Sequence, residues 1–157
     1  MTSGNYDLVQ FNLAIARHPL DHPSMAGFTS QLAEVNRLAE SSPGFVWTPA
    51  DGEAGDAIAT FGHPLVLANM STWRSLDDLR RFVYEGVHGG ALKQRREWFE
   101  PMAGPAYVLW WAPAQHRPDW IEAKQRLHDL KQHGPTPYAF TFTHAFSSSG
   151  AMLPVTE

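Results

Sequence analysis

Apolar and polar positions alternate in the first segment of the chain that predicts regular structure. Every second residue of 8–16 is large and apolar, namely Val9, Phe11, Leu13 and Ile15. The positions between them carry Gln10, Asn12 and Ala14. A period of two is typical of a β-strand whose two faces meet different surroundings. The dipeptide His18-Pro19 ends this predicted strand, because the residue before a proline is restricted.

Two further kinds of spacing divide the rest of the chain. Apolar residues three and four positions apart predict helices at 24–40, 75–88, 91–100 and 119–132, with Asp21 or Ser24 as the first N-cap and Ser75 as the second. Short apolar or alternating runs predict strands at 44–48, 64–73 and 106–112. A fifth strand is predicted at 138–146. The segment 49–62, rich in Gly, Ala and Asp, is interpreted as a mobile loop.

The order of these elements predicts the fold class. A β-α-β-β-α-β order is the split βαβ pattern of ferredoxin-like α+β domains, with residues 114–157 as a C-terminal α-β extension of one domain spanning 1–157. Helices on one face of a four-stranded antiparallel sheet leave the other face bare. That face is too apolar for water, so we expect a second copy to cover it in a homodimer.

Composition narrows the functional classes without naming one. The 157 residues include no cysteine, which excludes disulfides and thiolate metal sites. The net charge of −4, without a basic block, argues against a nucleic-acid partner. We see no secretory signal and no run of about 18 apolar residues that a membrane span requires, so we expect a cytoplasmic protein with no membrane partner.

Polar residues inside apolar elements are the candidates for chemistry. Asn12 lies within the first strand, Asn69 shares a strand face with Trp73, and His88 ends the second helix beside a Gly pair. Polar groups among aromatic residues are typical of a small-molecule pocket. Each has an alternative reading: a structurally bonded Asn, a Trp that closes the core, and a solvated or helix-capping His.

The remaining sequence motifs indicate no specific function. Tyr84, His88 and Arg95 would lie on one side of a helix, either as a polar pocket wall or as its outer face. The charge run 93–97 is typical of a solvated helix face. The eight histidines lack the spacing of a zinc site, and no phosphate loop or nucleophile elbow is present.

Several stretches carry a family resemblance. They are FNLAIARHPLDHPSM, SPGFVW, NMSTWRSLDDLRRFVYEGVHGGALKQRREWFE, YVLWWAPAQHRP and HGPTPYAFTF. Together these resemble the bacterial domain-of-unknown-function family 3291, over roughly residues 8–142. The resemblance implies the dimeric α/β-barrel superfamily, which also contains antibiotic-biosynthesis monooxygenases and heme-degrading monooxygenases. A resemblance of this kind supports a fold more strongly than a function.

The resemblance also implies site residues. Heme-degrading members use an Asn on the first strand, a Trp at the end of the third strand and a His on the second helix, which correspond here to Asn12, Trp73 and His88. The antibiotic-biosynthesis enzymes need no cofactor, because the carbanion of their flat aromatic substrate reacts with oxygen itself.

Three functions follow as hypotheses. The leading one is a monooxygenase-like oxidoreductase for a hydrophobic, aromatic small molecule, with His88 as general base and Asn12 and Asn69 orienting a substrate oxygen. Its pocket would be lined by tryptophans, namely Trp47, Trp73 and Trp110 or Trp111. The second is heme binding, with His88 as axial ligand and Arg95 or Arg96 on a propionate. The third is a ligand-binding module without chemistry.

Overall fold

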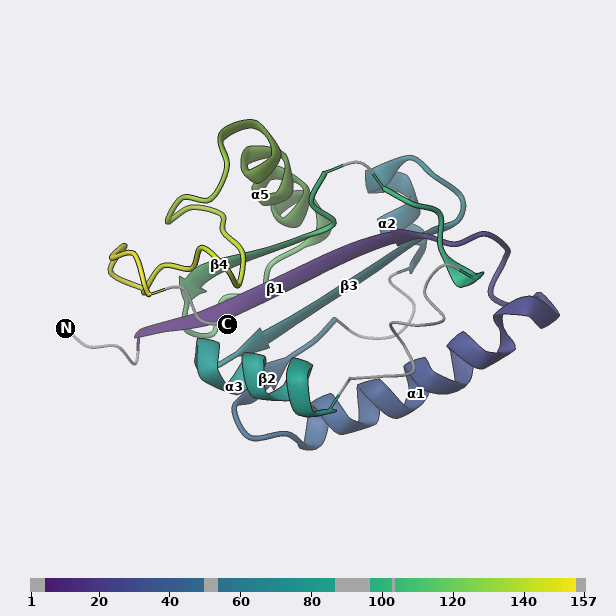
Figure 1. The fold of residues 1–157 in the computed structure, drawn as a ribbon, viewed down its shortest axis with the longest axis horizontal. Coiled ribbons are helices and arrows are strands. Elements are labelled where there is room, and N and C mark those ends of the chain that lie inside the picture. The colour runs from purple at the N-terminus through teal and green to yellow at the C-terminus, as the bar shows by residue number, and fades with distance from the viewer. Residues whose placement is uncertain (1–4, 50–53, 87–96, 103, 155–157) are drawn as a thin grey trace.

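The protein is a mixed α+β domain built on one antiparallel sheet (Figure 1). A computed structural model describes residues 5–49, 54–86, 97–102 and 104–154. The strands are β1 (Tyr6–Ile15), β2 (Phe45–Trp47), β3 (Val66–Trp73) and β4 (Tyr107–Pro113). The helices are α1 (Ala26–Ser41), α2 (Ala54–Phe61), α3 (Leu76–Arg81) and α5 (Trp120–His133). In the part of the chain thus described, no helix has the length and apolar character to cross a membrane.

The sheet confirms the predicted ferredoxin-like topology. Its strand order is β2-β3-β1-β4, so β1 lies in the interior and pairs antiparallel with both β3 and β4. Leu8 pairs with Trp73 on one side and with Trp111 on the other. Because side chains alternate along each strand, this register assigns every residue of the three strands to one of two faces. The sheet is open and does not close into a barrel.

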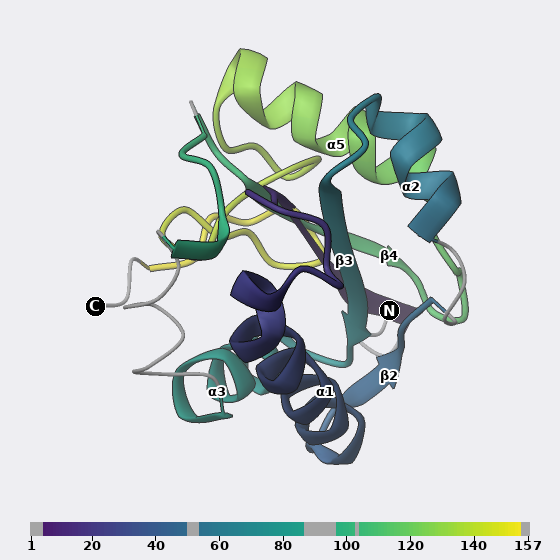
Figure 2. The same cartoon turned by 90° about the vertical axis from the view of Figure 1, so that its right-hand side faces the viewer.

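One face of the sheet carries the large alternating residues of β1 and is covered by α2 and α5 (Figure 2). Val9, Phe11 and Trp110 are fully buried there, together with Ala123 of α5. The expectation that a second copy must cover a bare apolar face is therefore wrong in its premise, because this chain supplies two covering helices. A homodimer itself is not tested by a single chain.

Helix α2 also corrects the prediction of a loop over 49–62. The segment AGDAIATF places Ala57 and Phe61 four residues apart, so both lie on the same side of the helix. Ala57 is buried against the sheet, and the Phe61 ring stacks on that of Phe11 at 5.4 Å. Contacts with the sheet thus support a helix in which three alanines favour the helical state and one Gly and one Asp oppose it.

The opposite face lies against α1, α3 and the C-terminal segment (Figure 2). Two separate apolar clusters form on it. The first contains Leu8, Trp73, Leu76, Leu79, Leu109, Phe140, Ala145 and Phe146. The second lies at the other end of β1 and contains Ala16, Met25 and Trp98. The two clusters leave the middle of this face to other residues.

The C-terminal segment does not form the predicted fifth strand at 138–146. Instead, a single bridge joins Phe140 to the free edge of β4, where Leu109 and Phe140 exchange hydrogen bonds of 2.8 and 2.9 Å between their backbone groups. The chain then turns over the sheet face, and the Trp111 indole donates to the carbonyl oxygen of Phe146 at 2.7 Å. The appendage is therefore part of the core.

The structure confirms one of the two predicted N-caps and contradicts the other. Ser75 confirms its predicted role, since its side chain accepts a hydrogen bond from the Asp78 amide and the helix continues as a π-helical turn, Phe82–Gly86. Neither Asp21 nor Ser24 caps the first helix: His22 caps a short 3₁₀ turn, Pro23–Met25, which leads into α1. Most of the helical piece predicted at 91–100 lies outside the described residues.

Candidate functional site

A row of polar side chains crosses the middle of the sheet, between the two apolar clusters. The register places Asn12 of β1 opposite Asn69 of β3 and opposite Tyr107 of β4. Asn12 is exposed although its strand lies in the interior of the sheet, and Asn69 and Tyr107 are half-buried. This part of the face is therefore an open, polar area with apolar walls at both ends.

Hydrogen bonds join the polar side chains across the two strands. The Gln10 amide nitrogen donates to Asn69 Oδ1 and to Ser71 Oγ, both at 2.9 Å. Asn12 Nδ2 donates to Gln10 Oε1 at 3.1 Å, and the Trp73 indole donates to Ser71 Oγ at 2.8 Å. We call Gln10, Asn12 and Asn69 the amide floor. Ser71 and Trp73 anchor this floor from the buried side.

The amide floor retains hydrogen-bonding groups for a ligand. Gln10 donates one amide hydrogen to Asn69 and the other to Ser71. Within the described chain, Asn69 keeps two N–H hydrogens and Asn12 keeps one N–H and its carbonyl oxygen without a partner. Three N–H hydrogens thus have no partner, and Asn12 Oδ1 is the one amide oxygen of the floor that accepts no hydrogen bond from the described chain. An oxygen atom of a ligand is the group that such a donor-rich surface binds best.

Tyr107 bounds the floor on the β4 side. Its hydroxyl accepts a hydrogen bond from the backbone N–H of Phe142 at 3.1 Å, and the two rings lie 5.6 Å apart. Burial raises the pKa of Tyr107 above the ordinary value of 10.0, and the hydrogen bonds from the Phe142 backbone and the Thr141 side chain act in the opposite direction. The phenol is therefore neutral at physiological pH.

The raised pKa of Tyr107 predicts a loss of stability in alkali. Above pH 10 the folded protein holds this phenol proton more tightly than the unfolded chain, so the free energy of unfolding falls as pH rises through the raised pKa. Below pH 10 the contribution is fully present. Denaturant unfolding between pH 8 and 11 should show a shallower alkaline fall for Tyr107→Phe than for the wild type, with the exposed Tyr6→Phe as control. Equal slopes would contradict the assignment.

The predicted site residues divide between the two faces. Asn12 and Asn69 meet at the amide floor. Trp73 shares their face but is fully buried under Phe45 and Phe82, so it reaches the floor only through Ser71. Trp111 shares the face too, under the C-terminal segment.

The other predicted residues do not join them. Trp47 and Trp110 point to the opposite face, where the Arg117 guanidinium lies 5.5 Å from the Trp47 ring centroid. They therefore cannot line one pocket together with Asn12. Tyr84 is exposed, with its ring 6.3 Å from that of Phe142. His88 and Arg95 lie outside the described residues.

Sequence reasoning missed Gln10, Ser71 and Tyr107 as members of the site. Gln10 and Ser71 were recognisable as polar residues on the faces of Asn12 and Asn69, since they lie two positions away. Tyr107 begins an apolar strand and gave no separate signal. What joins these residues is the register of the sheet.

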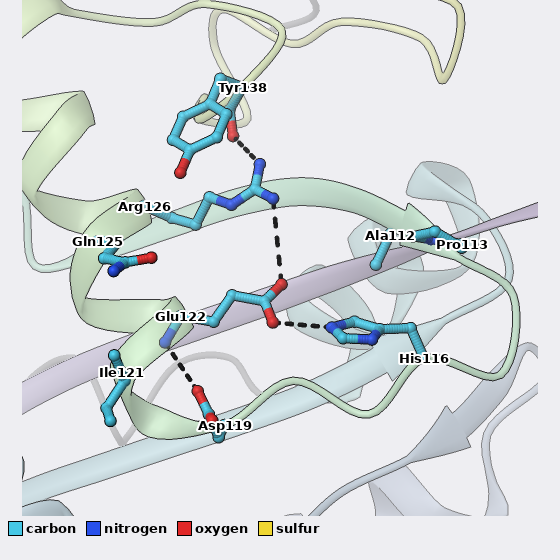
Figure 3. A pocket seen from close by; sticks show the side chains of 9 residues that line it. All are labelled: Ala112, Pro113, His116, Asp119, Ile121, Glu122, Gln125, Arg126 and Tyr138. Atoms are coloured by element: carbon cyan, nitrogen blue, oxygen red, sulfur yellow. Dashed lines mark hydrogen bonds and ion pairs between the residues drawn. The ribbon is translucent and has the colours of Figure 1, made fainter.

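A cavity of about 560 Å³ lies on the α5 side of the sheet, away from the amide floor (Figure 3). Its polar groups pair with one another: Glu122 contacts His116 Nε2 at 2.7 Å and accepts the Trp110 indole N–H at 3.0 Å. Arg126 donates to the backbone oxygen of Tyr138 at 2.8 Å and lies 4.0 Å from Glu122. These contacts fasten α5 to β4. In the described ranges, no three His, Asp or Glu side chains stand together as metal ligands would.

The role of Glu122 in fastening α5 can be tested by two substitutions. Glu122→Ala leaves the fully buried Trp110 indole N–H without an acceptor, which should lower the free energy of unfolding by about 1–3 kcal/mol. Glu122→Gln keeps an acceptor oxygen and should cost less. Urea unfolding measures both. Equal losses in the two variants would show that charge pairing, and not the indole bond, is the important contact.

Comparisons with known proteins give one match. A family model described as "Domain of unknown function (DUF3291)" matches residues 7–154, almost the whole chain. No curated protein matches the chain, and no solved structure does. The family description names no substrate, cofactor or reaction.

Proposed function

Because the chain belongs to the DUF3291 family, which names no activity, we propose a function from the site: the amide floor binds a hydrophobic, aromatic small molecule, and the protein oxidises it as a monooxygenase. The observation that carries the proposal is an exposed, hydrogen-bonded Asn12 in the interior of a sheet, between two apolar clusters. A cavity with apolar walls and few oriented polar groups is how ligand sites are built.

The geometry favours a flat ligand that carries an oxygen. The ligand ring would lie between the cluster around Trp73 and Leu8 and the cluster around Met25 and Trp98. Its oxygen would accept hydrogen bonds from Asn12 and Asn69. Such donors stabilise the negative charge that develops on an oxygen when a C–H conjugated to its carbonyl loses a proton.

The reaction that fits this chemistry needs molecular oxygen as oxidant. A CH₂ group that is conjugated to a carbonyl through aromatic rings becomes a C=O group, and one atom of O₂ enters the product while the other leaves as water. His88, whose ordinary pKa of about 6.5 suits a general base, is proposed to remove the first proton. Asn12 and Asn69 then hold the oxygen of the resulting enolate.

The test uses anthrone, a flat ketone with an activated CH₂ group, and measures oxygen uptake and the mass of the product. We expect turnover that Asn12→Ala and Asn69→Ala each reduce by about 10²-fold, by analogy with the loss of one oxyanion donor. His88→Ala should reduce it by about 10²–10⁴-fold. Ile121→Ala, at an exposed position on α5, should retain the wild-type rate. An unaffected rate in His88→Ala would remove this residue from the mechanism.

Binding measurements on the same protein distinguish the two alternative functions. Saturable binding of anthrone without oxygen uptake would favour a non-catalytic ligand-binding module. A Soret band on titration with hemin, lost in His88→Ala, would favour heme binding; no contact of the described residues favours it, since His88, Arg95 and Arg96 lie outside them. The homodimer stays a prediction, which analytical sedimentation can test. Because α2 and α5 cover one face of the sheet, two copies cannot pair through that face.

A further inference from the structure

We propose that Gln10 sets the hydrogen-bonding preference of the amide floor without contacting the ligand itself. Gln10 thereby makes the site select for ligands that accept hydrogen bonds. The inference rests on the proposed function, because it concerns the same site. Gln10 lies on the interior strand and bonds to both asparagines. It is the one residue of the described chain that joins them.

The position of Gln10 is fixed from the buried side. Ser71 Oγ accepts the Gln10 amide at 2.9 Å and the Trp73 indole at 2.8 Å. Trp73 is fully buried and Ser71 is 8% exposed, so neither anchor can turn toward a ligand. An indole N–H only donates, and it therefore holds the Ser71 oxygen in place. Gln10 is thus held at its amide end.

The amide of Gln10 decides which atoms of the two asparagines remain free. In the structure the Gln10 nitrogen donates to Asn69 Oδ1, and the Gln10 oxygen accepts one N–H hydrogen of Asn12. The groups left over are three N–H hydrogens and one carbonyl oxygen. If the three amides all turned over, the asparagines would exchange roles and the count would be the same. An excess of donors is therefore a property of the amide at position 10.

A carboxylate at position 10 would change this count. Glu has no hydrogen to give, so Asn69 must turn its own N–H toward it and present Oδ1 to the ligand. The asparagines then offer two hydrogens and two oxygens, beside a negative charge. Gln10→Glu keeps the size and shape of the side chain. It removes the excess of N–H donors from the floor, while Asn12 and Asn69 themselves are not substituted.

The test compares two probes of equal shape, 2-acetonaphthone and 2-isopropenylnaphthalene, which differ in a C=O against a C=CH₂ group. The wild type should bind the ketone roughly five- to tenfold more tightly, the value of about one net hydrogen bond. In Gln10→Glu the ratio of the two dissociation constants should fall to about one. In Gln10→Met neither asparagine amide is held in place any longer, so the ratio should fall below the wild-type value. Gln125→Glu, the same change at an exposed position of α5, should keep the wild-type ratio.

Each outcome separates this inference from the proposed function. If the wild type binds neither probe, or binds both equally, the proposed site fails. If the wild type prefers the ketone and Asn69→Ala loses that preference, while Gln10→Glu and Gln10→Met keep it, the site stands and the inference about Gln10 is overturned. Gln10→Met provides the answer should the Glu variant not fold, since methionine introduces no charge.

Discussion

Trp73→Ala is expected to lower the free energy of unfolding by about 3–5 kcal/mol, the range for removing a large aromatic side chain from a core. Trp73 is fully buried, its ring stacks on Phe82 at 5.1 Å and meets Phe45 edge-on at 5.5 Å. The substitution leaves a cavity that these neighbours only partly fill. Since whole domains are stable by about 5–15 kcal/mol, this one change removes a large share. Urea unfolding, followed by the fluorescence of the remaining tryptophans, measures it.

Trp73→Phe is the matched control. It keeps an aromatic ring between the same neighbours but loses the indole hydrogen bond to Ser71, whose net value is about 1 kcal/mol. The Phe variant should therefore be clearly more stable than the Ala variant. If both lose the same stability, the hydrogen bond to Ser71 is the dominant contribution of this residue, and ring packing is not.

Ala123→Arg is the second large effect, expected to cost on the order of 4 kcal/mol or to prevent folding. Ala123 is completely buried where α5 lies on the sheet, with Leu127 and Leu130 on the same side of the helix. An arginine there must either bury an unpaired charge or push α5 away from β4. Thermal unfolding and size-exclusion chromatography show which of the two occurs.

His128→Arg controls for the helix itself, because His128 is exposed on α5. A surface change of this kind should alter stability by less than about 0.5 kcal/mol. If Ala123→Arg is tolerated as well as His128→Arg, α5 does not cover this face in solution. The face would then be free for a second subunit, as the sequence alone suggested.

The strand pattern was the most predictable part of the fold. In β1, Val9 and Phe11 differ from Gln10 and Asn12 because the two faces meet different surroundings, and that difference is written in the order of residues. Helix α2 also carries such a pattern, and it was missed. Ala54, Ala57, Ile58 and Phe61 recur at three- and four-residue steps, but the Gly and Asp residues of this segment favoured the interpretation as a loop.

The error about the bare sheet face had the same origin. The prediction placed helices on one face alone, so the other apolar face required a partner. The cover came from a segment interpreted as a loop and from one interpreted as an appendage. An inference about quaternary structure depends on every element being placed, whereas an inference about one strand depends on that strand only.

The candidate site was predictable as residues but not as a network. Asn12 and Asn69 were each recognisable as polar positions in apolar strands. Their link through Gln10 spans 59 residues to Asn69 and follows from the antiparallel register. The sequence also left Trp110 and Trp111 as alternatives for one pocket, and parity along β4 places them on opposite faces. Only Trp111 shares the face of the amide floor.

The bridge between Phe140 and Leu109 has a consequence for how copies of this protein meet. An edge strand with free N–H and C=O groups invites pairing with an edge from another molecule, and the apolar β4 would be a strong template for such growth. Phe140 occupies both groups of Leu109 near the centre of that edge. At the other edge, β2 has only three residues. The middle of β4 is thus paired by the C-terminal segment of the same chain, and we expect this pairing to oppose edge-to-edge association of sheets at high concentration.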